Sequence, residues 1–232
     1  MTIELFELRG KDPDLRFSPN VWPTRMALVH KQLPFTSVPW RFTEKDAIAF
    51  SGQKMVPVIR DAGKSVHDSW AIANYLEDTY PDRPSLFGGP AGKAGIVFFR
   101  RYVTTIYGAA APIAVLPVWN CLDEEDQAYF RDTREARLGR KLEDVCGDIA
   151  QRLDTFRTAL GPMRAMLGDQ PFAGGDAPLY SDHMLFGVIQ WLRCVADVDL
   201  FEKDDPVADW VERMLDAYDG HARAAKTCRT AA

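Results

Sequence analysis

The chain has 232 residues, a length that accommodates one large domain or two small ones. Its 28 lysines and arginines against 33 aspartates and glutamates give a net charge of −5, which excludes the basic face that a sequence-independent nucleic-acid binder needs. With 47% apolar and 26% charged residues the composition is that of an ordinary globular protein, and its 11% of aromatic residues could fill a core or line a pocket for a flat ligand.

Other broad features exclude further classes of protein. No run approaches 18 consecutive apolar residues, so no transmembrane helix and no membrane partner are expected, and the acidic start MTIELFELRGKD is not a secretory signal. The four cysteines form no Cys-x-x-Cys pair and the four histidines no His-x-x-x-His pair, so we expect neither a disulfide framework nor a metal site. The sequence therefore predicts a cytoplasmic protein with reduced thiols.

Strand and helix signals alternate over the first eighty residues. Short apolar or β-branched runs predict strands at 3–8, 35–42, 56–59 and 65–67. Between and after them, helical spacing predicts a helix that begins near Pro23, a short one at 44–50 capped by Thr43, and one at 69–79. The order is β-α-β-α-β-β-α, with a hairpin joining the last two strands. This order predicts a mixed four-stranded sheet of the thioredoxin-like type.

Helical patterns dominate the rest of the chain. They cover residues 92–115, 124–167, 181–195 and 206–218, and glycines inside the second pattern predict that it is divided or kinked. A segment rich in proline and glycine separates the two halves. The expected organisation is a thioredoxin-like domain at 1–82, a linker at 83–92 and an all-helical domain at 93–232. The linker is not a phosphate-binding loop, because Phe87 stands where that motif needs glycine.

Proline follows Val56 inside the third predicted strand, where it removes a donor from the strand ladder. Two interpretations remain open. The Val56–Pro57 bond is cis and the freed backbone of Val56 faces a ligand, or Pro57 is an ordinary trans proline in an edge strand.

Asp68 and Ser69 stand at the predicted start of the helix at 69–79. Ser69 is a candidate N-cap, and free N–H groups with a serine hydroxyl at a helix start also bind a carboxylate. Asp68 beside them would pair with an ammonium group. Together the two residues match the γ-glutamyl end of glutathione, which carries both charges on one carbon.

Ser18 precedes the first helix at the place where thioredoxins have a redox-active cysteine pair, so disulfide exchange is not expected. Its hydroxyl could donate to a bound thiolate, or Ser18 could simply be a turn residue before Pro19. A free thiol has a pKa near 8.5, and lowering it by about two units requires roughly 2.7 kcal/mol. One hydrogen bond to a charged acceptor supplies ~1.5–3 kcal/mol and a helix end ~0.3–1 kcal/mol, which is sufficient.

Four segments together resemble the cytosolic glutathione transferases: SPNVWPTR, MVPVI, HDSWAIANYLEDTYPDRPSLF and GGDAPLYSDH. The resemblance spans most of the chain and is closest to the bacterial β-etherase type, which cleaves aryl ether bonds in lignin fragments. It implies the glutathione transferase fold, in which a thioredoxin-like domain binds glutathione and a helical domain contributes the hydrophobic substrate site. It also implies a homodimer.

The resemblance assigns roles to the residues that match the family pattern. Ser18 resembles the thiol-activating serine, and Asn20 is the other candidate for that role. Val56, before Pro57, resembles the backbone clamp on the cysteinyl unit. Asp68 and Ser69 match the γ-glutamyl pair.

The chain departs from the family pattern at three places. Pro23 and Met55 each replace a basic residue that is common in the family, so the glycyl carboxylate of glutathione would fall to Gln53 or Lys54. Leu179 replaces the usual serine or threonine of a helix cap, and Asp182 is expected to serve that helix start alone.

The hydrophobic substrate site has no motif, and aromatic side chains are its candidates. Because most aromatic residues at helical spacing lie in the core, we expect no more than half of them to contact substrate. The candidates are Trp22, Tyr107, Trp119 and Phe186, together with Phe42, Phe99 and Trp191.

These features predict a transferase in which a glutathione thiolate, with glutathione as cosubstrate, attacks a small aromatic electrophile. If the β-etherase resemblance extends to the chemistry, the attacked carbon lies next to a ketone and a phenolate leaves. The alternatives are a glutathione-dependent isomerase or dehalogenase on the same fold, and a non-catalytic protein that binds aromatic ligands.

Overall fold

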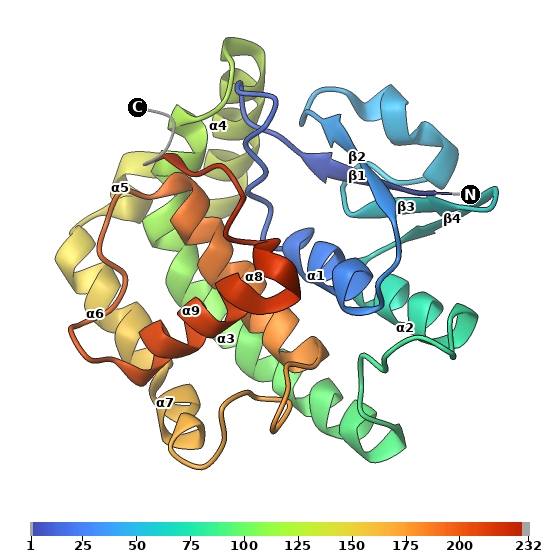
Figure 1. Cartoon of the computed structure of the whole chain (residues 1–232). Coiled ribbons are helices and arrows are strands. Elements are labelled where there is room, and N and C mark those ends of the chain that lie inside the picture. The colour runs from blue at the N-terminus through green and yellow to red at the C-terminus, as the bar shows by residue number, and fades with distance from the viewer. Residues whose placement is uncertain (1, 229–232) are drawn as a thin grey trace.

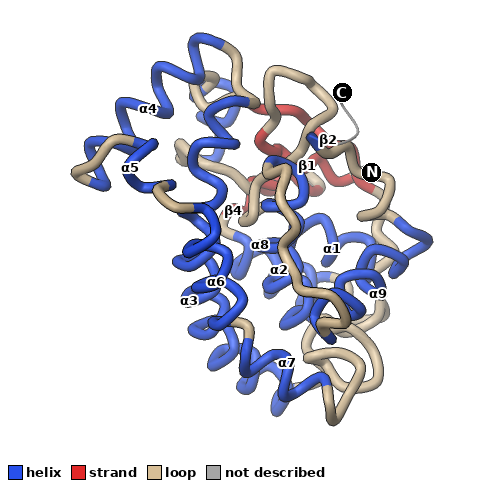
Figure 2. Tube along the Cα trace, turned by 90° about the vertical axis from the view of Figure 1, so that its left-hand side faces the viewer, coloured by secondary structure: helices blue, strands red, loops and turns tan. Residues whose placement is uncertain are grey.

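The computed structural model of the protein describes residues 2–228. Figure 1 shows the strands gathered on one side of the molecule, and the helices of the second half of the chain on the other. Seen from the side, the strands again form one compact group (Figure 2). The strands are β1 (Ile3–Leu8), β2 (Phe35–Trp40), β3 (Val58–Asp61) and β4 (Lys64–His67).

The strands form one mixed sheet in the order β2-β1-β3-β4. β1 runs parallel to β2, with Ile3 opposite Phe35, and antiparallel to β3, with Leu5 opposite Ile59. β3 and β4 pair as an antiparallel hairpin. The predicted thioredoxin-like sheet is confirmed. β3 begins at Val58 and not at residue 56 as expected, because Pro57 has no N–H to donate to the ladder.

Three helical segments accompany the sheet: α1 (Trp22–His30), the 3-10 helix η1 (Lys45–Ser51) and α2 (Ser69–Thr79). α1 carries Pro23 in its first turn, as predicted, and forms the crossover between the parallel strands β1 and β2. Thr43 was expected to cap η1, but Glu44 occupies the cap position. The Thr43 hydroxyl instead donates to Asp126 Oδ1 at 2.8 Å, so it ties the sheet half to the helical half.

The predicted pattern at 124–167 divides into four helices. Gly139 and Gly147 end two of them with φ of 65° and 57°, a conformation in which glycine carries no steric cost. α3 starts at Pro90, so the last three residues of the predicted linker are helical. The helices of the second half are α3 (Pro90–Asn120), α4 (Glu124–Leu138), α5 (Leu142–Cys146), α6 (Ile149–Ala159), α7 (Gly161–Leu167), α8 (Tyr180–Val195) and α9 (Pro206–Gly220).

α3 is long and apolar enough to cross a membrane by length and composition alone, with a mean hydropathy of 1.3 over 18 residues. In the structure it packs against α8, α6 and α5. It is therefore a core helix of the helical half.

α8 occupies the centre of the molecule, between α1 and α3. Every residue of α8 except Arg193 is buried, as expected for a helix that is covered on all sides. One continuous apolar cluster joins Phe6 and Met26 of the sheet half to Leu185 and Trp210 of the helical half. A second cluster packs Leu5, Leu28 and Ile72 of the sheet half against Tyr180 and Met184 of α8, so apolar packing crosses the boundary between the halves in both clusters.

Asp182 fastens the start of α8, as the sequence predicted. Its carboxylate accepts hydrogen bonds from the backbone N–H groups of Leu179 (3.1 Å), Ala173 (2.7 Å) and Gly174 (2.8 Å) and from Trp210 Nε1 (3.0 Å). Burial raises the pKa of Asp182, and these donors oppose that rise.

Candidate active site

A cavity of about 390 Å³ lies between the two halves of the molecule. It is bounded by the loop before α1, the first residue of α2, one face of α3 and two residues of α8. These segments lie far apart in the sequence. The lining residues are Pro19, Asn20, Pro23, Ser69, Arg100, Val103, Thr104, Tyr107, Met184 and Val188.

Ser18 and Asn20 belong to the turn that leads into α1. The carbonyl oxygen of Ser18 accepts hydrogen bonds from the N–H groups of Val21 and Trp22, each at 3.1 Å, and these bonds fix the turn. The Ser18 side chain is buried and has no hydrogen-bonding partner among residues 2–228. Asn20 is exposed and lines the cavity. Ser18 itself does not line the cavity, but its neighbours Pro19 and Asn20 do.

Val56 and Pro57 join the loop after η1 to β3. The Val56–Pro57 peptide bond is cis, as the first of the two interpretations predicted, and the ordinary trans proline is excluded. Val56 is half-buried and lies outside the strand ladder, and its backbone N–H and C=O have no partner among the described residues. The backbone of Val56 therefore retains its capacity to bind an amide.

Asp68 is the N-cap of α2, which corrects the expectation that Ser69 holds that position. Asp68 Oδ1 accepts from the N–H groups of Trp70 and Ala71, each at 3.0 Å. Asp68 Oδ2 is left without a partner within residues 2–228, and Asp68 itself has a φ of 69°, which is rare for a residue other than glycine. Ser69 becomes the first helical residue, so its N–H is not needed by the helix. The start of α2 therefore offers one carboxylate oxygen and one N–H donor side by side.

Gln53 and Lys54 lie on the loop before Val56, outside the cavity. The Gln53 N–H donates to Ser51 Oγ at 3.2 Å, and the Lys54 carbonyl accepts from Lys45 Nζ at 3.0 Å. The Lys45 ammonium also lies 4.7 Å from the ring centre of Trp40. Lys45 is a cation next to this loop that the sequence comparison with the family pattern did not single out.

The structure separates the predicted aromatic substrate residues. Tyr107 lines the cavity and stacks on Trp191, with ring centres 5.3 Å apart. Trp22 and Phe186 are fully buried, which corrects the expectation that they contact substrate. Their rings fill the shared core, where Trp22 Nε1 donates to the carbonyl of Arg16 at 3.1 Å. Trp119 is half-buried, donates to the carbonyl of Gln127 at 3.2 Å and does not line the cavity.

One face of α3 supplies cavity residues that sequence reasoning missed. Arg100, Val103, Thr104 and Tyr107 recur at intervals of three and four, so they lie on one side of the helix. The spacing was visible in the sequence. Arg100 was missed, because only aromatic side chains were candidates for the hydrophobic substrate site.

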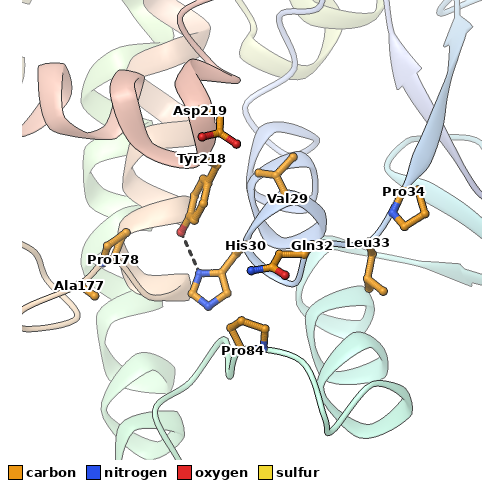
Figure 3. A pocket seen from close by; sticks show the side chains of 10 residues that line it. All are labelled: Val29, His30, Gln32, Leu33, Pro34, Pro84, Ala177, Pro178, Tyr218 and Asp219. Carbon is orange, nitrogen blue, oxygen red and sulfur yellow. Dashed lines mark hydrogen bonds between the residues drawn. The ribbon is translucent and has the colours of Figure 1, made fainter.

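A larger cavity, of about 690 Å³, lies at the other end of α1 (Figure 3). On its wall, Tyr218 Oη is 2.8 Å from His30 Nδ1 and 2.8 Å from His183 Nε2, and His30 Nε2 is 3.0 Å from the Ser85 carbonyl. A carbonyl only accepts, so His30 donates from Nε2 and accepts the Tyr218 proton at Nδ1. These polar groups are already paired with one another. The smaller cavity is the better candidate site, because the unused groups of Ser69 and of the Ser18 turn gather there.

Comparison with known proteins agrees with this geometry. Residues 13–84 match the model of the glutathione S-transferase N-terminal domain, and residues 96–219 match that of the glutathione S-transferase C-terminal domain. The second match alone covers more than half of the chain.

Similar proteins come from fungi and plants. The structure of glutathione transferase GSTFuA3 from Phanerochaete chrysosporium is 26% identical, with a TM-score of 0.84 over 94% of this chain and 97% of that one. The glutathione S-transferase CsGST63524 of Ceriporiopsis subvermispora, solved in complex with glutathione, is 27% identical, with a TM-score of 0.84 over 94% and 98% of the two chains. A probable glutathione S-transferase, GSTU6 of Oryza sativa subsp. japonica, is 25% identical over 85% of this chain and 80% of its own length. None of these three is described as a β-etherase.

Proposed function

Because the chain belongs to the glutathione S-transferase family, we propose that it joins glutathione to an aromatic electrophile in the cavity between its two halves. One observation carries the proposal. Asn20 and Ser69 line the same cavity. Asn20 belongs to the turn that contains Ser18, and Ser69 is the first residue of α2. One glutathione molecule needs both at the same time: the Ser18 turn for its sulfur and the start of α2 for its γ-glutamyl end.

Glutathione is bound by three elements in this proposal. Its γ-glutamyl carboxylate accepts a hydrogen bond from the N–H of Ser69 at the positive end of α2, and its ammonium group forms an ion pair with Asp68 Oδ2. The backbone of Val56 pairs with the cysteinyl unit. Gln53 or Lys54, on the loop before Val56, faces the glycyl carboxylate. The sulfur then lies at the Ser18 hydroxyl.

The Ser18 hydroxyl donates a hydrogen bond to the thiolate and stabilises it against the thiol. A bond to a charged acceptor is worth ~1.5–3 kcal/mol, which lowers a thiol pKa by about one to two units. The thiolate attacks the electrophilic carbon, the S–C bond forms, and the bond from carbon to the leaving group breaks with its electron pair on the leaving group. Holding both reactants in one cavity supplies much of the remaining rate.

Replacing Ser18 by alanine tests this role directly. We expect Ser18→Ala to lower kcat/KM with a chloronitrobenzene by about 10- to 100-fold and to raise the pKa of bound glutathione, measured by thiolate absorbance. Ser65→Ala, on exposed β4, is the matched control and should behave as the parent protein. Full activity of Ser18→Ala would transfer the role to Asn20.

Two substitutions at Asp68 separate its charge from its capping role. Asparagine also caps helices and tolerates a positive φ, so Asp68→Asn should keep the thermal stability of the parent. It should raise KM for glutathione about 3- to 10-fold, because the ammonium loses its counter-charge. Asp68→Ala should also lose ~1 kcal/mol of stability. An unchanged KM in both variants would remove Asp68 from the binding site.

The specific reaction that we propose is the cleavage of a β-aryl ether. The resemblance of the quoted segments supports it, and so does the ring of Tyr107, which lines the cavity and stacks on Trp191. The test is product analysis with a β-aryl ether ketone and glutathione, for which we expect a phenol and a glutathione thioether. Regenerated glutathione or released halide with other substrates would favour an isomerase or a dehalogenase. Aromatic binding without glutathione binding in calorimetry would favour a non-catalytic binding protein.

We also propose a homodimer in the cytoplasm. Phe98 of α3 is 79% exposed and Met55 is 73% exposed, which is costly for a monomer in water. None of the four cysteines forms a disulfide bond within the described residues, in keeping with a reducing compartment. Light scattering should give twice the chain mass, and Phe98→Asp should shift it towards the monomer. A monomeric parent protein would contradict the assembly.

A further inference from the structure

Arg100 carries the only formal charge among the described residues that line the candidate active site. It stands on α3, one turn before Thr104 and two turns before Tyr107. The rest of the α3 and α8 wall is apolar or neutral. A cation in such a wall attracts an anionic ligand.

Arg100 forms no ion pair with an acidic side chain within residues 2–228. Its guanidinium carbon lies 4.5 Å from the ring centre of Trp70, and the Trp70 ring packs on Tyr180 at 5.9 Å. Stacking on a ring uses the face of the guanidinium and leaves the N–H donors at its edge free. Arg25 and Arg41 on other elements, in contrast, each pair with a carboxylate.

Both ends of glutathione already have partners in the proposed function. The γ-glutamyl end lies at the start of α2, and the glycyl end faces the loop before Val56. Arg100 belongs instead to the same face of α3 as Tyr107, whose ring stacks on Trp191 and offers a flat surface to the second substrate. A rise of 1.5 Å per residue separates the Cα atoms of Arg100 and Tyr107 by about 10 Å along the axis. This spacing suits one aromatic ring with an acidic substituent.

We propose that Arg100 selects electrophiles that carry a carboxylate on the aromatic ring. The assignment rests on the proposed function. The guanidinium edge binds the carboxylate through charge-assisted hydrogen bonds, while the ring lies against Tyr107. The carboxylate is unchanged in the reaction. With a chloroarene, the glutathione sulfur forms the S–C bond and chloride leaves with the electron pair.

Two substrates that differ only in charge test the proposal. A chloronitrobenzoate and the matching chloronitrobenzamide share the ring and the leaving group. We expect the parent protein to prefer the benzoate, and Arg100→Gln to lower kcat/KM for the benzoate about 10- to 100-fold and for the amide less than about threefold. Arg100→Lys keeps the charge and should restore part of the preference. Arg101→Gln, at an exposed neighbouring position of α3, should match the parent.

Other outcomes overturn the assignment. Equal losses for both substrates, with KM for glutathione raised, would place Arg100 on glutathione. A parent protein that converts the amide as well as the benzoate would leave the transferase function intact and remove the carboxylate selectivity.

A binding measurement makes the test independent of turnover. Nitrobenzoate and nitrobenzamide lack the leaving group, and their affinities are measured by tryptophan fluorescence with S-methylglutathione present. We expect nitrobenzoate to bind more tightly than nitrobenzamide, and this preference to disappear in Arg100→Gln and to weaken at high ionic strength. A preference that survives Arg100→Gln, or no preference in the parent protein, would overturn the assignment whether or not catalysis is seen.

Discussion

The hydroxyl of Tyr180 donates a hydrogen bond to the carbonyl oxygen of Ser69 at 2.7 Å. This bond joins the first residue of α8 to the first residue of α2, across the boundary between the two halves. Tyr180 is fully buried, and burial raises the pKa of its hydroxyl, so it stays a neutral donor. The helix that forms part of the electrophile wall therefore also holds the helix start that is proposed to bind glutathione.

Removing this hydroxyl should affect glutathione more than the chemical step. We expect Tyr180→Phe to lose ~1 kcal/mol of stability and to raise KM for glutathione severalfold, with kcat nearly unchanged. Tyr102→Phe is the matched control, because Tyr102 Oη also donates to a carbonyl, that of Ala159 at 3.1 Å, but within the helical half. Steady-state kinetics and thermal unfolding measure both variants. Equal KM values in the two would show that the Tyr180 bond is structural only.

Gly187 lets α8 approach the Ser18 turn closely. A Cβ at this position would lie 2.7 Å from Pro23 Cδ and 2.9 Å from the Pro19 carbonyl oxygen. Gly187→Ala should therefore displace the turn, cost about 1–3 kcal/mol of stability and lower kcat/KM. Gly108→Ala, where a Cβ meets nothing within 4 Å, should instead stabilise by roughly 0.5–1 kcal/mol. Urea unfolding and activity assays check the pair, and parent-like activity of Gly187→Ala would disconnect α8 from the site.

Glu7 is fully buried in β1 and forms ion pairs with Arg25 and Arg16. Glu7→Gln would leave these guanidinium groups without a counter-charge, and we expect a loss of about 3–5 kcal/mol in the free energy of unfolding. Glu4, on the same strand, pairs with Arg60 where both side chains are partly exposed. Glu4→Gln should therefore cost no more than ~1 kcal/mol. Similar losses in the two variants, measured by urea unfolding, would contradict the role of burial.

Buried imidazoles should make the protein lose stability in mild acid. Burial lowers the pKa of His183 and of His30, and it lowers the pKa of His221 to about 4. In the unfolded chain these histidines have an ordinary pKa near 6.5, so they bind protons at pH values at which the folded protein does not. The free energy of unfolding has its full value above about pH 6.5. It falls as the pH drops below about 6.5, by up to ~1.4 kcal/mol per pH unit for each such histidine.

Urea unfolding at several pH values between neutral and mildly acidic conditions measures this slope. His183→Gln should flatten it, although the variant is less stable throughout. His67→Gln, which removes an exposed imidazole of β4, should leave it unchanged. A parent slope near zero would mean that the folded protein accepts these protons after all.

Local signals predicted most of the fold, because they act within a few residues. The bounds of α2 followed from the polar pair that starts it and the proline after Tyr80. The helix that contains Pro112 was expected to end near residue 115, yet α3 continues past Pro117 to Asn120. Each proline removes one helical hydrogen bond, and packing of α3 on α8 outweighs that loss.

The candidate site was predictable only where backbone geometry determines it. Ser18, Asp68 and Ser69, which are proposed to bind glutathione, stand in a turn before a helix or at a helix start, features that the sequence indicates directly. Arg100 was missed, because the face of α3 that borders a cavity depends on how α3 packs against a distant helix. Trp22 and Phe186 were misplaced, because an aromatic side chain has the same apolar character in a core and in a cavity wall.

α8 comes from the helical half of the chain and is covered on one side by α1 of the sheet half. Separating the halves at the segment between them would expose that side and divide the cluster that joins Met26 to Leu185. We therefore expect the two halves to unfold together, because the cluster that crosses their boundary is lost when they separate. The boundary predicted from the sequence thus separates two architectures, whereas the free energy of unfolding depends on the packing between them.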